Sequence, residues 1–343
     1  MTSCIPAGDP RTGLSVLYLG GTGVISSACV TACLERGHRV TTVTRGTSER
    51  RLAGEVDQLH ADVRDGDALR AVLGEREFDV VVDVLAFHPD NVRTSLDATY
   101  GRHGQYVFIS SASAYQTPPA RLPITESTPL RNPFWEYSRN KIACEDLLTA
   151  AYRADGLPVT IVRPSHTYDA TSPPVTGGWT VIDRLRRGAP VVVPGDGTSL
   201  WTITHARDFA AAFVHLLGNP AAIGEAVHIT GDEAPPWNAI YTMLAAAARV
   251  EPRLVHVASD EICAAAPEMT GSLLGDKSNS TVFDNAKIKA LAPGWAARTT
   301  FAEGAREIVA WHDADPARGR RDPDFDRLCD RLVEGRAPAI TSG

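Results

Sequence analysis

The sequence contains few cysteines, and none of them is spaced as a metal or redox pair. Six occur in 343 residues, and no two form a CxxC pair. Scattered cysteines of this kind are typical of reduced thiols in a cytoplasm rather than of a disulfide framework or a zinc site. We therefore expect a cytoplasmic protein without a bound metal. The six are Cys4, Cys29, Cys33, Cys144, Cys263 and Cys329.

Long apolar runs and a positive net charge are also absent. No stretch approaches the roughly 18 consecutive apolar residues that a membrane-spanning helix needs. Residues 1–13 are polar and lack the basic-then-apolar order of a signal peptide. Lys and Arg number 34 against 41 Asp and Glu, a net charge of −7, whereas general nucleic-acid binders need a positive surface. We expect neither a membrane nor, by default, a nucleic acid as partner.

The sequence does have enough apolar residues for a sizeable core, and its first half alternates strand and helix patterns. Hydrophobic residues make up 43% of a chain that is long enough for about two domains. The alternation is typical of a parallel sheet with helices on both faces. We expect strands at 16–19, 40–44, 56–60, 79–85, 106–110, 159–162, 190–193, 226–229 and 254–257. We expect helices at 25–36, 68–75, 90–102, 135–153, 180–187 and 205–217, with a loop at 169–178.

A glycine-rich turn joins the first strand to the first helix. It reads Gly-Gly-Thr-Gly-Val-Ile-Ser over residues 20–26, with Ser26 in the third small position. Glycines at this place let the backbone approach a pyrophosphate, and the helix N-terminus supplies oriented N–H groups. An ordinary strand–helix turn is the alternative. The turn predicts cofactor contacts at Gly20, Thr22, Gly23, Val24 and Ile25.

The end of the second strand bears on the choice of cofactor. An acidic residue there would hold the ribose of NAD, but this sequence has Thr44 and Arg45, followed by Arg50 and Arg51. Arg45 slightly favours NADP over NAD, although a solvated basic loop is the alternative. Asp62, after the third strand, is placed to accept a hydrogen bond from adenine, and its alternative role is a helix N-cap.

Tyr137 and Lys141 are four residues apart and therefore share one helix face. A Lys ammonium lowers the pKa of such a tyrosine and can hold a cofactor ribose, so that the phenol can exchange a proton with a substrate hydroxyl. Upstream, Ser110 and Ser111 end an apolar strand, where parallel sheets bind their ligands. The alternative is that these serines only cap the strand exit.

Four segments together resemble a known family. GGTGVIS, ISSASAY, YSRNK and IVRPSHTYD have the order and spacing of the extended short-chain dehydrogenase/reductase superfamily, in its NAD-dependent epimerase/dehydratase family. The resemblance covers roughly residues 16–229. It implies an α/β fold with a Rossmann-type doubly wound parallel sheet and a smaller, mainly C-terminal α/β substrate lobe.

The resemblance also implies a division of the chain. Residues 1–13 form a flexible tail, and 14–168 with about 200–230 form the NAD(P)-binding domain. Residues 169–199 and 231–315 form the substrate lobe, and 316–343 form a surface helix and tail. The family often dimerises through the helix that carries Tyr137, so a homodimer is expected.

The same resemblance assigns roles to individual residues. Tyr137 is similar to the family's catalytic acid/base, Lys141 to its partner and Ser111 to its catalytic Ser or Thr. For three of the expected substrate contacts another role is the alternative: a structural role for His166, packing for Trp201 and a salt bridge for Arg207. The implied cofactor contacts also include Val63, Leu85, Ala86, Ser110, Tyr137, Lys141 and Pro164. The implied substrate contacts are Ser113, His166, Trp201 and Arg207.

Two departures from the family pattern shape the expected function. Ala112 and Ser113 stand where 4,6-dehydratases have an Asp-Glu pair, which disfavours that class. We expect an epimerase that acts on the sugar of a nucleotide-sugar or nucleoside-like substrate through a transient ketone, with tightly bound NAD⁺. The alternatives are a dehydratase that uses another acid, an NADP-linked dehydrogenase or reductase of a sugar or secondary metabolite, and a non-catalytic nucleotide- or RNA-associated relative. Asp169-Ala170 replaces a frequent Gly-Pro, so an unusual substrate loop is expected.

Overall fold

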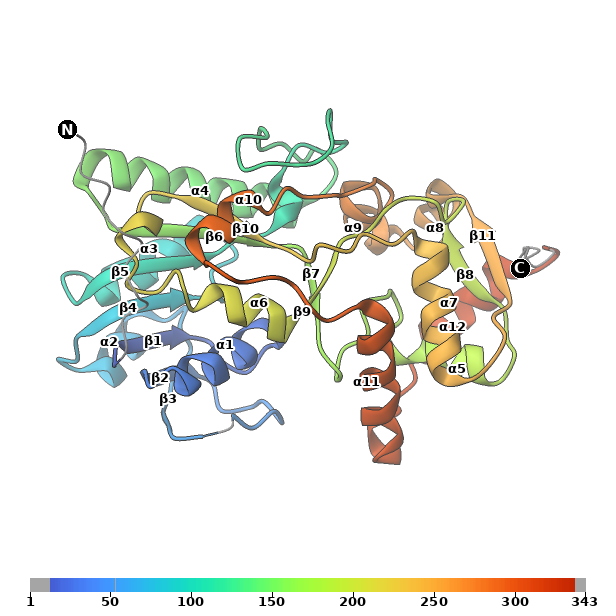
Figure 1. Ribbon diagram of the computed structural model, residues 1–343, viewed down its shortest axis with the longest axis horizontal. Coiled ribbons are helices and arrows are strands. Elements are labelled where there is room, and N and C mark those ends of the chain that lie inside the picture. Colours follow the sequence, from blue (N-terminus) through green and yellow to red (C-terminus); the bar gives the residue numbers. More distant parts are fainter. Residues whose placement is uncertain (1–12, 53, 337–343) are drawn as a thin grey trace.

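A seven-stranded parallel sheet forms the larger part of the protein. The computed structural model describes residues 13–52 and 54–336, so that residues 1–12 of the expected tail and residues 337–343 lie outside the described part. The strand order is β10-β6-β5-β4-β1-β2-β3, and every pair of neighbours is parallel (Figure 1). The strands are β1 (Ser15–Leu19), β2 (Arg39–Thr44), β3 (Val56–His60), β4 (Phe78–Asp83), β5 (His103–Ile109), β6 (Val159–Pro164) and β10 (Ala226–Ile229).

Helices cover both faces of this sheet. Val16 and Tyr18 of β1 belong to the core on one face, whereas Leu17 and Leu19 belong to the core on the other. This alternation gives each face its own apolar layer, as a doubly wound fold requires. The predicted fold class is therefore confirmed. Helices α1 (Val24–Glu35) and α6 (Ala206–Phe213) pack on the first face, and α2 (Gly66–Leu73), α3 (Pro89–Thr99) and α4 (Glu136–Asp155) on the second.

A smaller α/β lobe lies at the other end of the molecule, on the right in Figure 1. Its own core packs helices against a two-stranded parallel sheet, and a second short parallel pair runs between the lobes. The strands are β8 (Val191–Pro194) with β11 (Leu254–Val257), and β7 (His166–Tyr168) with β9 (Ile203–His205). The main helices are α5 (Trp179–Arg186), α7 (Trp237–Ala248), α8 (Ser259–Ala265), α11 (Phe301–Asp313) and α12 (Pro323–Val333).

Several boundaries differ from those expected, each for a local reason. The fourth strand ends at Asp83 and not at residue 85, because the Asp83 carboxylate accepts from the backbone N–H groups of Leu85 and Ala86. The short strands β7 and β9 were not predicted. Helix α10 (Ala286–Leu291) was placed in the substrate lobe, but Ile288 belongs to the core of the larger lobe. Within the described residues, no helix has the length and apolar character that crossing a membrane requires.

A buried ion pair fastens α4 to the sheet. The Arg163 guanidinium, on β6, donates to both carboxylate oxygens of Glu145, on α4, and the side chains are 6% and 2% exposed. The Ser110 hydroxyl, at the end of β5, donates to the same carboxylate. Because a buried charge without its partner is costly, this cluster holds one helix and two strands in a fixed relation.

We expect the Glu145→Ala variant to lose about 3–5 kcal/mol of unfolding free energy, because the Arg163 charge would stay buried without a partner. Asp146→Ala, the adjacent but exposed position on α4, is the control and should change stability by less than about 0.5 kcal/mol. Urea unfolding followed by circular dichroism measures both. Equal stability of the two variants would contradict the assigned role of the pair.

Candidate active site

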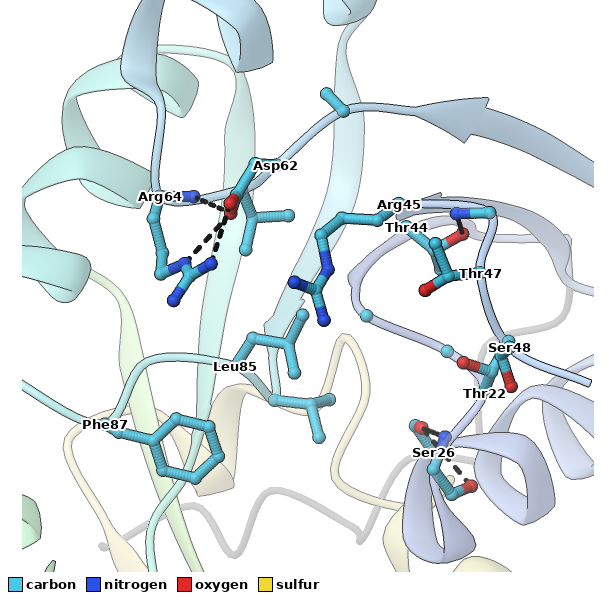
Figure 2. A pocket seen from close by; sticks show the side chains of 17 residues that line it. Thr22, Ser26, Thr44, Arg45, Thr47, Ser48, Asp62, Arg64, Leu85 and Phe87 are labelled. Atoms are coloured by element: carbon cyan, nitrogen blue, oxygen red, sulfur yellow. Dashed lines mark hydrogen bonds and ion pairs between the residues drawn. The ribbon is translucent and has the colours of Figure 1, made fainter.

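Two cavities lie at the carboxyl edge of the large sheet. The first has a volume of about 330 Å³ and is lined by the glycine turn, the loop after β2, the loop after β3 and the loop after β4 (Figure 2). The second, of about 280 Å³, is lined by Tyr137 and by residues of both lobes. Since the carboxyl ends of parallel strands are where such folds bind ligands, both cavities are candidate parts of one site.

The glycine turn has the shape that a phosphate needs. Gly20 and Gly21 have φ values of +109° and +144°, and a Cβ on Gly21 would lie 2.9 Å from the Thr42 Cγ2 atom. The turn leads into α1, which has no acidic residue in its first turn, so the positive end of the helix is free of a competing carboxylate. These residues fit the pyrophosphate of a dinucleotide. Thr22 and Gly23 line this cavity, whereas Ile25 lines the second one, and Val24 lines neither.

Arg45 points into the first cavity, between Leu85 and the ion pair that Asp62 forms with Arg64 (Figure 2). Arg64 donates to both carboxylate oxygens of Asp62, at 2.8 and 3.0 Å, and these hydrogen bonds lower the Asp62 pKa to about 2. The helix cap that was the alternative for Asp62 is wrong, because the N-cap of α2 is Asp65. Val63 and Leu85 also line the cavity.

Arg50 does not belong to the rim of this cavity. Its guanidinium donates to Asp169 at 2.5 Å, to Ser27 at 3.0 Å and to Thr171 at 2.5 Å. Arg50 thereby ties the loop after β2 to α1 and to the loop after β7. Asp169, which departs from the family's frequent Gly-Pro, has a structural partner here, and that ion pair helps to lower the Asp169 pKa.

Lys141 is buried behind Tyr137. Its ammonium donates to the backbone carbonyls of Ala86 and Ile109, both at 2.8 Å, and lies 5.9 Å from the centre of the Tyr137 ring. An ammonium has three hydrogens to donate, and these two bonds use two of them; the side chain is 1% exposed and lines neither cavity. Burial lowers the pKa of Lys141 to about 8, which keeps the side chain charged at neutral pH.

Tyr137 is half-buried and lines the second cavity with Ser111. Burial raises the pKa of its phenol, and a hydrogen bond with the Ser111 hydroxyl opposes that rise. Ser111 also contacts the Ser113 hydroxyl at 2.9 Å, and Ser138 donates to Ser113 at 2.8 Å. The structure thus brings together a phenol, a chain of hydroxyls and a buried ammonium. Proton transfer requires such groups to lie close to one another.

Of the remaining predicted residues, some line the second cavity and others line neither cavity. Pro164, His166 and Trp201 line the second cavity, and burial lowers the His166 pKa to about 3, so its imidazole is neutral. The side chain of Ser110, expected at the cofactor, lines neither cavity because it bonds to Glu145. Arg207 also lines neither cavity, because its guanidinium, 62% exposed, pairs with Glu307 at 2.9 Å. Arg207 thus forms the salt bridge that was its alternative role.

Several residues that line the second cavity were not predicted from the sequence, and four of them are aromatic or charged. Trp135, the N-cap residue of α4, lies two residues before Tyr137, and the two ring centres are 4.8 Å apart. Asp276, Lys277 and Phe283 come from an irregular stretch of the smaller lobe. No motif marks these three positions, whereas the proximity of Trp135 to Tyr137 in the sequence was a usable signal.

Comparison with known proteins agrees with this geometry. A profile described as the NAD dependent epimerase/dehydratase family matches residues 16–230. A UDP-glucose 4-epimerase from Bifidobacterium longum, solved with NAD⁺ and UDP, superposes with a TM-score of 0.72 at 20% identity. That superposition covers 89% of this chain and all of the other, and it shows the fold.

Two curated proteins are similar in sequence over most of this chain. The chloroplast stem-loop binding protein of 41 kDa b of Arabidopsis thaliana is 30% identical over 255 residues, which is 70% of this chain and 65% of that protein. A 2'-dehydrokanamycin reductase of Streptomyces kanamyceticus is 29% identical over 243 residues, covering 69% and 67%. The chain thus spans a little under two thirds of the first relative's length. By the family profile, which covers more than half of its residues, the chain belongs to the NAD-dependent epimerase/dehydratase family.

Proposed function

We propose that the protein is an NADP-linked oxidoreductase that interconverts a ketone and a secondary hydroxyl group on a sugar-like substrate. The observation that carries this proposal is that Tyr137 and Ser111 line the second cavity together, with the Lys141 ammonium buried 5.9 Å from the centre of the Tyr137 ring. A bound nicotinamide supplies the hydride chemistry. The glycine turn and Arg45 would hold the pyrophosphate and adenosine parts of that cofactor, and Lys141 would hold its ribose with the remaining hydrogen.

The side chains of the cavity account for the proton transfer. In the reductive direction, the Tyr137 hydroxyl donates its proton to the substrate oxygen as that oxygen gains negative charge. The Ser111 hydroxyl donates a hydrogen bond to the same oxygen and so orients it. The Lys141 ammonium favours the phenolate that Tyr137 leaves behind. In the oxidative direction each proton moves the other way.

The reductive direction is supported by the basic character of the cofactor cavity. Arg45 points into it, and the end of β2 carries no carboxylate that would repel a 2′-phosphate. NADPH is a dissociable reductant, which suits net reduction. The similar 2'-dehydrokanamycin reductase is, by its name, a reductase of a sugar-derived ketone, in agreement with this direction.

The expected epimerase remains a second candidate. Its supporting observation is the same Ser111, Tyr137 and Lys141 set without an acid at Ala112 or Ser113. An epimerase would invert one carbon without net consumption of NADPH, whereas a reductase consumes one NADPH per product. The stem-loop binding relative raises the RNA-associated alternative, and the complete set of proton-transfer groups disfavours it.

Tyr137→Phe should lower kcat for ketone reduction by about 10²–10⁴-fold, because it removes the proton donor and keeps the ring. NADPH affinity should stay within about twofold of the wild-type value, since the phenol oxygen lies outside the first cavity. Tyr100→Phe, at a side chain that is 86% exposed, is the matched control. The steady-state rate of loss of NADPH absorbance, measured with a panel of sugar ketones, gives kcat. Undiminished turnover by Tyr137→Phe would refute the proposal.

The reduction rate should fall as pH rises through about 8. Below that pH, the Lys141 ammonium is charged and Tyr137, whose pKa is raised, is protonated. Above it, Lys141 loses its charge and no longer favours the phenolate. The pH profile of kcat/KM measures this. Lys141→Arg, which stays charged, should shift the fall to higher pH even if its maximal rate is lower, and an unshifted profile would exclude Lys141 as the titrating group.

Arg45→Ala should raise the Kd for NADPH by about 10–100-fold and leave that for NADH nearly unchanged, since a charge-assisted bond contributes about 1.5–3 kcal/mol. Arg51→Ala is the matched control, because Arg51 is exposed and lies outside the lining of the first cavity. Fluorescence titration with both nucleotides measures the two dissociation constants of each variant. Equal losses for NADPH and NADH would show that Arg45 does not read the 2′-phosphate.

A further inference from the structure

Asp276 reaches the second cavity from a turn that is packed tightly against the start of α4, the helix that carries Tyr137. The π-helical turn Leu273–Lys277 lies beside Trp135, and a Cβ on Gly275 would come within 2.9 Å of the Trp135 Cβ atom. The Asn132 amide donates to the Gly275 carbonyl at 2.7 Å. Only a glycine fits at that contact, and the next residue, Asp276, is thereby placed in the lining of the cavity together with Tyr137.

Two polar groups of this cavity have no partner within the described part of the chain. The Asp276 carboxylate makes no hydrogen bond or ion pair there, although the Tyr137 phenol and the Lys277 ammonium are near enough to act on it through space. The indole N–H of Trp201, in a side chain that is 2% exposed, has no acceptor. Because buried polar groups are nearly always satisfied, the Trp201 N–H is left as a donor, and the half-buried Asp276 carboxylate is an unpaired acceptor in the cavity wall.

The cavity is poor in the charges that a diphosphate requires. Among the residues that line it, Lys277 is the one cation and Asp276 the one anion, and His166 is neutral. Arginine guanidinium groups, which donate two parallel hydrogen bonds, are the usual partners of phosphate groups. Arg163 and Arg207, which lie on elements near this cavity, are paired with Glu145 and Glu307.

The size and walls of the cavity suit a sugar ring. Its volume of about 280 Å³ lies just below the usual range for drug-sized ligands, about 300–1,000 Å³. Trp135, Trp201 and Phe283 supply aromatic faces, and Lys277 lies 5.8 Å from the centre of the Trp201 ring. Apolar ring faces with a few convergent polar groups are typical of sites that orient a small polar ring.

We propose that this cavity takes a sugar ring that carries no nucleoside diphosphate. Asp276 accepts a hydrogen bond from a hydroxyl or amino group of the ring, Trp201 donates to a ring oxygen, and the Asp276 charge repels a diphosphate. This proposal rests on the oxidoreductase function proposed for the same site. It replaces the nucleotide-sugar substrate expected from the sequence with an unphosphorylated glycoside.

The first test is calorimetric titration with UDP-glucose in the presence of saturating NADP⁺, which keeps the nucleotide out of the first cavity. The wild-type protein should show no binding at about 1 mM, and Asp276→Asn should bind at least about tenfold more tightly. Glu268 is exposed, lies outside the lining of the second cavity and belongs to a separate groove that Trp135 and Gly271 also line, so Glu268→Gln should behave as wild type. Micromolar binding by the wild type would overturn the proposal, and absent binding in both proteins would overturn the role of Asp276.

The second test is saturation-transfer NMR with glucosamine as the ring probe. Saturation should pass from the wild-type protein to the ring protons of glucosamine. Both Asp276→Asn and Trp201→Phe should weaken this saturation-transfer signal several-fold. Trp201→Phe keeps an aromatic wall and removes the N–H donor together with part of the ring. No signal with the wild type, or equal signals in all three proteins, would contradict the proposal. Both tests measure binding and not turnover. A failure of the proposed oxidoreductase function would appear in the kinetic assay of Tyr137→Phe, whereas a failure of the proposed sugar specificity would appear in these two binding tests.

Discussion

The site depends on the hydrogen bonds that tie the Lys141 ammonium to the carbonyls of Ala86 and Ile109. These carbonyls lie in the loop after β4 and at the end of β5, so one side chain fixes α4 against the carboxyl edge of the sheet. Tyr137 comes one turn earlier on the same helix face and Glu145 one turn later. A single stripe with a spacing of four residues therefore carries Tyr137, Lys141 and the Glu145 anchor to β6. In the proposed mechanism, the first two are the proton donor and the charge that supports it.

The two lobes divide the work of the site. The larger lobe supplies the glycine turn, Arg45 and the proton-transfer groups, all on regular elements or in the turns that follow them directly. The smaller lobe supplies Trp201 and Asp276, which complete the wall of the second cavity. In the proposed function, the proton transfer thus belongs to residues of the sheet edge and α4, and the selection of a substrate belongs to segments of the smaller lobe.

The sequence predicts those features that depend on short-range spacing. The alternating strands, the glycine turn and the pair Tyr137 and Lys141 are examples, because a period of two or four residues determines which side chains share a face. Features that depend on distant partners could not be predicted in this way. Arg50 follows Arg45 closely in the sequence, but its guanidinium is held by Asp169, which is 119 residues away. The contact between Gly275 and Trp135, which positions Asp276, likewise has no sequence pattern.

The most direct test of the central claim is a measurement of the nucleotide that the purified protein carries. A dissociable NADP-linked oxidoreductase should release little nucleotide when it is denatured, and the native protein should then take up one equivalent of NADPH reversibly. Mass spectrometry of the released nucleotide and a titration with NADPH give the two values. Stoichiometric NAD⁺ in the released fraction, with no uptake of NADPH, would contradict the account and favour an internal redox cycle.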